Sequence, residues 1–271
     1  MRFVSYDAGE GPRCGVLDGD RIADAGPGGA DALLREGGLP DAVAALSEPV
    51  ALADVRLLPP VLDPSKIVCM GLNYREHAAE AGLDPPETPT FFAKFRNALA
   101  DPGAEVALPG YSEKVDYEAE VAFVIGRRCK DVPEAEALGV VAGYTLLNDL
   151  SARDYQFMTP QWLPGKVFDG SAPCGPALVT PDEAGPHDAI EISLTLNGET
   201  MQSGSTADLI HSVPALVAYL SKLMTLEPGD MVSTGTPAGV GSVRQPQVWL
   251  KPGDEVVVES PTLGRLETRL T

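Results

Sequence analysis

Two glutamates separated by one residue stand out in the stretch VDYEAEVAFVIG, which begins at Val115. Apolar residues alternate through this stretch, and such alternation predicts a β-strand with one buried face. Glu118 and Glu120 then lie on the same face of the strand, roughly 7 Å apart along it. The residues that follow on that face are apolar, so the two carboxylates are expected to lead into a partly buried surface.

A third carboxylate, Asp149, ends the apolar strand sequence YTLLND. Carboxylates on a partly desolvated face repel each other, so either one of them takes up a proton or a cation binds between them. Three oxygen donors without Cys or His beside them suit a hard divalent ion, Mg²⁺ or Mn²⁺. The E-x-E pattern also fits a solvated strand edge, and from the residues alone the two interpretations are near parity.

A histidine and a glutamate three residues apart form a second candidate group, His77 and Glu80. We expect both on one face of a helix from Tyr74 to Ala81, with Asn73 as its N-cap and Glu76 completing a capping box. A carboxylate beside an imidazole favours the protonated ring and orients it, as a general base requires. Spacing alone favours a surface pair on an amphipathic helix.

Two glycine-rich loops are further candidates. Lys166 lies in LPGKVFDGSAPCGP, a loop that either holds a cation over a site or is surface. The stretch STGTPAGVG at 233–241 lacks the Gly-Lys-Ser/Thr of a P-loop and the G-x-G-x-x-G spacing. We therefore expect no nucleotide site there.

Around these groups the chain is rich in predicted strands and has a few helices. Short strands in residues 1–24 are joined by a turn at Gly19-Asp20, and residues 30–37 and 40–47 have helical patterns. Asn197-Gly198 predicts a further hairpin. The overall pattern indicates a mainly β protein with α/β elements.

The stretch LLPPVLDPSK holds three prolines in ten residues and indicates an extended linker. We place a domain boundary there. A small N-terminal domain is expected at 1–60 and a larger one at 61–271.

Composition narrows the function classes. The 271 residues carry a formal net charge of −19, which argues against nucleic acid and anionic membrane surfaces as partners. The four cysteines are scattered and form no CxxC pair, so neither a thiolate zinc site nor a disulfide scaffold is expected. No apolar run is long enough for a membrane span, and no secretion signal is evident at the N-terminus. The expected location is cytoplasmic.

Five stretches occur together and in order: PSKIVCMGLNYREHAAEAG, VDYEAEVAFVIG, GYTLLNDLSARDYQ, GKVFDGSAPCGP and DMVSTGTPAGVG. From about residue 60 to its end, the chain resembles the fumarylacetoacetate hydrolase family. The N-terminal part resembles the small leading domain of bacterial members. One departure follows Lys166, where many relatives have a Ser-Phe-Asp-Thr-like run.

The resemblance implies a mixed β-roll or sandwich core with a small N-terminal domain, assembled as a homodimer. It implies that Mg²⁺ or Mn²⁺ is held by Glu118, Glu120 and Asp149. His77 and Glu80 would form a water-activating pair on a lid helix, beside Lys166. The positions that face substrate in the family match Arg153, Gln156 and Thr236.

The resemblance favours a metal-dependent hydrolase that cleaves a C–C bond of a 1,3-diketo acid, of the acylpyruvate or fumarylpyruvate type, through an enolate held on the ion. The same groups could serve an oxaloacetate decarboxylase or an isomerase of 2-hydroxyhepta-2,4-diene-1,7-dioate or 5-carboxymethyl-2-hydroxymuconate. A non-catalytic metal-binding protein is less favoured, because such a protein would be expected to have lost His77, Glu80 or a ligand.

Overall fold

The computed structural model describes residues 1–39 and 49–271, and the helix predicted at 40–47 lies outside these ranges. The strands are β1 (Arg2–Asp7), β2 (Pro12–Asp18), β3 (Arg21–Pro27), β4 (Val50–Ala51), β5 (Arg56–Leu58), β6 (Ile67–Gly71), β7 (Thr90–Lys94), β8 (Leu99–Ala100), β9 (Glu105–Val106), β10 (Val115–Asp116), β11 (Ala119–Ile125), β12 (Val141–Asn148), β13 (Ser151–Ala152), β14 (Ala172–Val179), β15 (Glu191–Leu196), β16 (Glu199–Ser205), β17 (Met231–Ser233), β18 (Glu255–Ser260) and β19 (Gly264–Leu270). The α-helices are α1 (Ala30–Glu36), α2 (Arg75–Glu80), α3 (Arg153–Gln156), α4 (Pro181–Ala184) and α5 (Val213–Leu223). Short 3₁₀ helices are η2 (Leu52–Asp54), η3 (Arg96–Ala98), η4 (Glu134–Val140), η5 (Leu163–Gly165), η6 (Thr206–Asp208) and η7 (Gly241–Val243).

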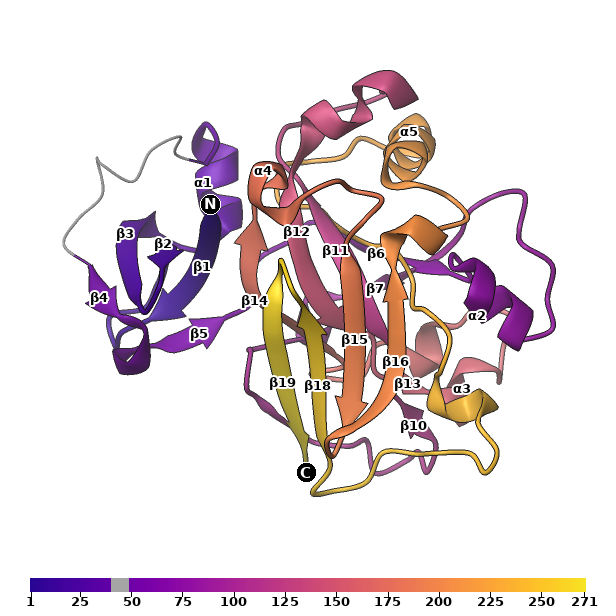
Figure 1. The fold of residues 1–271 in the computed structure, drawn as a ribbon. Coiled ribbons are helices and arrows are strands. Elements are labelled where there is room, and N and C mark those ends of the chain that lie inside the picture. The colour runs from indigo at the N-terminus through magenta and orange to yellow at the C-terminus, as the bar shows by residue number, and fades with distance from the viewer. Residues whose placement is uncertain (40–48) are drawn as a thin grey trace.

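Two sheets form the body of the protein. The larger one has the order β4-β3-β2-β1-β14-β12-β11-β17-β6-β7, and the smaller one has the order β16-β15-β18-β19-β9. Figure 1 shows β15, β16, β18 and β19 lying in front of β11 and β12. Side chains from both sheets meet in one core, for example Phe123 of β11, Leu194 of β15 and Val256 of β18. The predicted mainly β fold with a sandwich-like core is confirmed.

The central strand β11 is buried on both faces, whereas its alternating sequence predicted one buried face. Every residue from Ala119 to Ile125 is buried. Val121 and Phe123 enter the core shared by the two sheets, while Ala122 and Val124 enter a second core on the other side. The small and β-branched residues of the second face allow this close packing, so the carboxylates before and within β11 are carried into the interior.

The N-terminal strands extend the large sheet instead of standing apart from it. β1 pairs antiparallel with β2, and the two-residue turn between β2 and β3 lies at Gly19-Asp20 as predicted. β1 also pairs with β14 from the later part of the chain. Figure 1 shows this N-terminal part at one side of the molecule. The division of the chain at residue 60 stays a prediction.

The hairpin predicted at Asn197-Gly198 joins β15 to β16. Asn197 has φ 52° and Gly198 has φ 83°. Asparagine and glycine are the residues that adopt this left-handed conformation at least cost, which is why this pair turns the chain in two residues.

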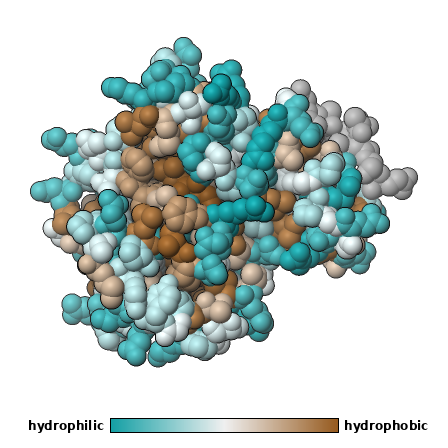
Figure 2. Space-filling view, turned by 180° about the vertical axis from the view of Figure 1, so that it is seen from behind, coloured by the Kyte–Doolittle hydropathy of each residue, from teal (hydrophilic) through white to brown (hydrophobic). Residues whose placement is uncertain are grey.

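Hydrophobic side chains gather over the middle of the face seen in Figure 2. Large hydrophobic residues exposed among those described are Leu83, Phe91, Phe95, Tyr111, Leu138, Phe157, Met158 and Leu223. Gathered apolar surface is typical of interaction sites. The homodimer stays a prediction. No helix within the described ranges is long and apolar enough to cross a membrane.

The cap predicted for the helix that carries His77 was wrong. Tyr74 is the N-cap of α2 and its own side chain makes no capping bond, while the Glu76 amide in the first turn donates to Asp208 Oδ2 (3.0 Å). The buried Asn73 side chain instead donates from Nδ2 to the carbonyls of Thr234 (2.9 Å) and His211 (3.1 Å), and its Oδ1 accepts from the amide of His211 (2.8 Å). Asn73 thus ties the start of α2 to the segments that follow β17 and precede α5.

Replacing Asn73 with alanine is expected to destabilise the protein by about 2–3 kcal/mol, because it leaves buried backbone groups of Thr234 and His211 without partners. Chemical denaturation monitored by circular dichroism measures the change. The control is Gln247→Ala, which removes an exposed side chain that donates to Ser242. An equal small effect of both substitutions would contradict the assignment.

Candidate active site

A cavity of about 180 Å³ collects most of the predicted site residues. Seven of the nine line it: His77, Glu118, Glu120, Arg153, Gln156, Lys166 and Thr236. The other two, Glu80 and Asp149, contact residues that line it. Side chains from α2, α3, β11 and three loops therefore meet at one place, although 159 positions separate His77 from Thr236 in the chain.

Lys166 is the centre of a buried ion network. Its Nζ donates to Glu118 Oε2 (2.7 Å), Asp149 Oδ2 (2.8 Å) and Ser151 Oγ (2.6 Å). The side chains of Lys166, Glu118 and Asp149 are all at most 7% exposed. Burial lowers the pKa of the Lys166 ammonium, but Asp149 and Glu118 raise it further, so the net pKa lies above its usual value. The lysine thus carries a positive charge in the interior.

A second buried lysine, which the sequence did not point to, completes the neutralisation of Asp149. Lys94 Nζ lies 2.7 Å from Asp149 Oδ1 and also donates to Ser171 Oγ (3.1 Å) and the Leu150 carbonyl (3.3 Å). Lys94 ends β7, a strand of otherwise apolar and small residues beyond its first threonine. A lysine in such a strand is the one local signal that could have indicated a buried charge.

Arg153 holds Glu118 from the opposite side. Its Nη2 donates to Glu118 Oε1 (2.7 Å), its Nε to Asp116 Oδ2 (2.9 Å) and its Nη1 to Gln156 Oε1 (2.9 Å). Burial raises the pKa of Glu118, but Arg153 and Lys166 lower it to well below its usual range. Arg153 and Gln156 line the cavity as expected, yet the guanidinium is engaged with two carboxylates.

Glu120 differs from its neighbour, because no cation contacts it among the described residues. It accepts a hydrogen bond from the Ser233 hydroxyl. Burial, and then the negative charges of Asp149 and Glu118, raise its pKa well above the usual value. The ion-paired groups are three carboxylates (Asp116, Glu118 and Asp149) and three cations (Lys94, Arg153 and Lys166), so Glu120 is one carboxylate in excess.

This excess of carboxylate fits a bound cation. Oxygens of Glu120 and Asp149 lie within 4.8 Å of each other and of the Cys69 sulfur. Burial raises the pKa of the Cys69 thiol well above its usual value, so the protonated sulfur is a weak ligand. Carboxylate oxygens are the donors that Mg²⁺ and Mn²⁺ prefer. Glu118, whose oxygens bind Arg153 and Lys166, remains a predicted third ligand.

His77 and Glu80 lie on α2 at the side of the cavity. His77 Nδ1 is 3.4 Å from Glu80 Oε2, and both Glu80 oxygens accept from the Gly239 amide at 3.1 Å. The His77 side chain is 13% exposed and that of Glu80 is 26% exposed. The pair therefore sits at the cavity wall, in contact with the glycine-rich loop, and differs from the surface pair that spacing alone favoured.

The glycine-rich loop at 233–241 positions acidic groups through its backbone. The amide of Gly241 donates to Asp116 Oδ1 (2.7 Å), and a Cβ at this glycine would lie 2.1 Å from the Val248 carbonyl oxygen. Thr236 of the same loop donates to the Ala119 carbonyl and accepts from Gln202 Nε2 (2.8 Å). Gly241 therefore allows a close backbone approach that a side chain would block.

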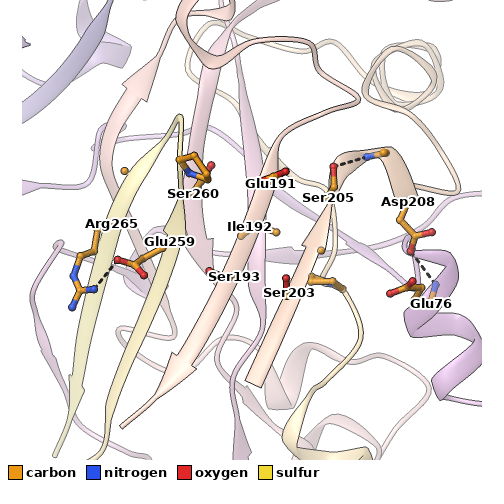
Figure 3. Close-up of a pocket in the computed structure, with 15 residues that line it drawn as sticks. Glu76, Glu191, Ile192, Ser193, Ser203, Ser205, Asp208, Glu259, Ser260 and Arg265 are labelled. Atoms are coloured by element: carbon orange, nitrogen blue, oxygen red, sulfur yellow. Dashed lines mark hydrogen bonds and ion pairs between the residues drawn. The ribbon is translucent and has the colours of Figure 1, made fainter. Parts of the chain in front are cut away.

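A larger hollow of about 1000 Å³ lies elsewhere, over the outer face of the five-stranded sheet (Figure 3). Exposed groups such as the Glu259–Arg265 ion pair line it. It contains no buried ion network and none of the predicted site residues. Glu76 lines this hollow while His77 lines the smaller cavity, so α2 separates the two.

Comparison with known proteins shows the family of the chain. Residues 66–271 match the family described as fumarylacetoacetate (FAA) hydrolase C-terminal, and residues 1–60 match the Rv2993c-like N-terminal family. The chain belongs to the fumarylacetoacetate hydrolase family. Members of this family are enzymes that act on small-molecule acids and generally use divalent metals.

Relatives within the family have several activities. The chain is 45% identical over 215 residues to a human mitochondrial oxaloacetate tautomerase, covering 78% of this chain and 68% of that protein. A 5-carboxymethyl-2-hydroxymuconate delta-isomerase from Mycobacterium smegmatis has a TM-score of 0.83 at 34% identity, covering 100% of this chain and 98% of that one. A fumarylacetoacetate hydrolase from Exiguobacterium antarcticum has a TM-score of 0.89 at 31% identity, covering 100% and 99%.

Removing the charge of Lys94 is expected to cost about 3–5 kcal/mol of stability, because Asp116, Glu118 and Asp149 then share two cations and one buried negative charge is left without a partner. The test variant is Lys94→Met, studied by urea unfolding without divalent metal. Arg269→Met is the control, since it removes one partner of an exposed ion pair with Glu255 and should cost less than about 1 kcal/mol. Similar losses in both variants would show that the buried pair has no special importance.

Mg²⁺ or Mn²⁺ is expected to raise the melting temperature of the protein, since an ion at one hundred times its Kd stabilises by about 2.7 kcal/mol. Glu120→Gln should reduce this rise by removing a ligand charge, whereas Glu191→Gln in the outer hollow should not. Differential scanning fluorimetry with metal titration gives the readout. A rise of the same size in Glu120→Gln would contradict the assignment of this ligand.

Proposed function

We propose that the protein is a tautomerase or isomerase of 2-oxo acids, which moves a proton between carbon and oxygen of the acid and its enol. The observation that carries this proposal is the single cavity in which a His–Glu pair faces a buried, charged lysine. The similarity to an oxaloacetate tautomerase and to a hydroxymuconate isomerase supports this chemistry over the C–C bond hydrolysis expected from the sequence.

Removing a proton next to a 2-oxo group places negative charge on the carbonyl oxygen. The Lys166 ammonium is fixed by Glu118, Asp149 and Ser151 and needs no reorganisation to stabilise such charge in a site shielded from water. Bound Mg²⁺ or Mn²⁺, held by Glu120 and Asp149 with Glu118, would add Lewis-acid stabilisation of the same negative charge.

His77 is the group that moves the proton. Glu80 contacts the ring at Nδ1, which leaves Nε2 to exchange a proton with the substrate. The Gly239 amide fixes Glu80, so the ring has one preferred orientation. Gln156 lines the same cavity, and its side-chain amide offers a hydrogen bond to the carboxylate of the acid.

Hydrolysis of a 1,3-diketo acid is the second candidate function. The same His77–Glu80 pair favours it, because a base oriented by a carboxylate can also activate water. Decarboxylation of oxaloacetate would use the stabilised negative charge without a water-activating base. A homodimer and a cytoplasmic location belong to the same proposal as expectations from the sequence.

The proposed function predicts that the protein with Mg²⁺ or Mn²⁺ accelerates the loss of enol absorbance of oxaloacetate. His77→Ala should slow this reaction by roughly 10²–10⁴-fold, because it removes the positioned acid–base group. The control is His187→Ala, which changes a histidine in a loop that contributes nothing to the cavity.

Parallel assays with acetylpyruvate and a 2-hydroxymuconate separate the candidates. Pyruvate release from acetylpyruvate at a rate above the tautomerisation of oxaloacetate would replace the proposal with the hydrolase. Carbon dioxide release that keeps pace with enol loss would replace it with the decarboxylase. If His77→Ala interconverts the keto and enol forms as fast as the unchanged protein does, the role of His77 is contradicted.

A further inference from the structure

Two kinds of residue line the cavity, and we call the part of the wall made by the charged and proton-transferring groups its polar half and the part made by hydrophobic side chains its hydrophobic half. The groups of the proposed proton transfer lie in a polar half with Glu118, Glu120 and Lys166. The large hydrophobic side chains of the wall include Met70, Leu83, Phe157, Trp162, Val240 and Val243. A 2-oxo acid group uses only the polar half, so the hydrophobic half faces whatever the acid carries beyond its reacting carbons.

Trp162 is held rigidly in this wall. Its ring meets the edge of the Phe92 ring at a centroid distance of 5.8 Å and an interplanar angle of 65°. Gly71 at the end of β6 lies directly against it, and a Cβ there would be 2.3 Å from Trp162 Cζ3. The packing on Phe92 and Gly71 thus restricts the movement of the indole where it lines the cavity.

Two further hydrophobic residues of the wall are open to solvent. Phe157 is 68% exposed and Leu83 is 50% exposed, although both line the cavity. Covering such apolar surface is favourable for a hydrocarbon ligand. Phe157 follows α3, and Leu83 follows α2, so these side chains border the cavity on the segments next to Gln156 and His77.

The charged groups near the cavity argue against a second carboxylate in the hydrophobic half. The cations among the described lining residues are Lys166, paired with Glu118 and Asp149, and Arg153, paired with Asp116 and Glu118. Both already neutralise buried carboxylates. A carboxylate at the tail of a ligand would lose hydration in the hydrophobic half without gaining an ion pair.

We infer that the preferred substrate is a 2-oxo acid whose chain continues beyond C3 as a hydrocarbon, and that Trp162 selects this tail. The inference rests on the proposed function, whose reacting end occupies the polar half. In this arrangement oxaloacetate fills the polar half alone. A longer acid adds contact with the indole, Phe157 and Leu83, which bind the tail and take no part in proton transfer.

Isothermal titration of the Mg²⁺-loaded full chain with pyruvate, 2-oxobutanoate, 2-oxopentanoate and 2-oxohexanoate tests this inference. The Kd should fall about fourfold for each added methylene. Oxaloacetate should bind no more tightly than 2-oxobutanoate, which has the same number of carbons. Trp162→Ala should abolish most of the dependence on chain length and leave the Kd of pyruvate within about twofold.

Two companion variants keep the test decisive. Phe95→Ala removes an exposed aromatic side chain outside the cavity and should preserve the full dependence on chain length. Gly71→Ala forces the indole towards the cavity and should weaken 2-oxohexanoate selectively. If Trp162→Ala does not fold, Gly71→Ala decides in its place.

The outcomes distinguish this inference from the proposed function. Binding of every 2-oxo acid with one Kd, or a dependence on chain length that survives a folded Trp162→Ala, overturns the inference alone. Failure of all the acids to bind overturns the proposed function as well. Normal chain-length dependence without turnover of enol-oxaloacetate overturns the proposed reaction and leaves the hydrophobic half as a tail site.

Discussion

The structure around the site depends on one constraint, the burial of the Lys166 ammonium between Glu118 and Asp149. A charge removed from water is tolerated only where opposite charges and hydrogen bonds surround it. Lys94 completes this environment behind Asp149, and Arg153 completes it behind Glu118. Segments that are distant in the chain are thereby fixed relative to one another. The rigidity that results is what a catalytic site needs, because charges held in advance stabilise developing charge without rearranging.

The fold buries these charges away from water, and burial strengthens their electrostatic effect. β11 is buried on both faces, so Glu120 reaches the interior beside Cys69 and Asp149. The loop after β17 closes over the start of the strand, and its amides bind Asp116 and Glu80. The glycine-rich segment 233–241 therefore joins the buried ion network to the His77–Glu80 pair on α2. Among the charged groups of the site, Glu120 is one carboxylate in excess of the cations. This excess matches the family's general use of a divalent ion.

In the proposed function the charged groups and the hydrophobic wall of the cavity have separate tasks. A fixed lysine and a carboxylate cluster serve any reaction that develops charge on a carbonyl oxygen. Tautomerisation, isomerisation, decarboxylation and C–C cleavage all do so. In our inference the hydrophobic wall around Trp162 contacts the part of the ligand that does not react, so its shape can vary without altering the charged half. Such a separation is compatible with one fold among relatives described as a tautomerase, an isomerase and a hydrolase.

Local sequence patterns determined many of the strands, the hairpin turns at 19–20 and 197–198, and the positions of the carboxylates before and within β11. Each of these depends on neighbouring residues, through side-chain alternation or turn conformation. Assigning the site residues required the family motifs as well, because spacing alone favoured a surface pair for His77 and Glu80. The tertiary structure decided the rest. Nothing local identifies Lys94 among the 20 Lys and Arg residues as the partner of Asp149, 55 positions away. Asn73 likewise fits a helix cap locally, yet its amide bonds groups that only folding brings near. Which charges are buried together depends on pairing between distant strands, and that pairing has no signature in any short stretch of sequence.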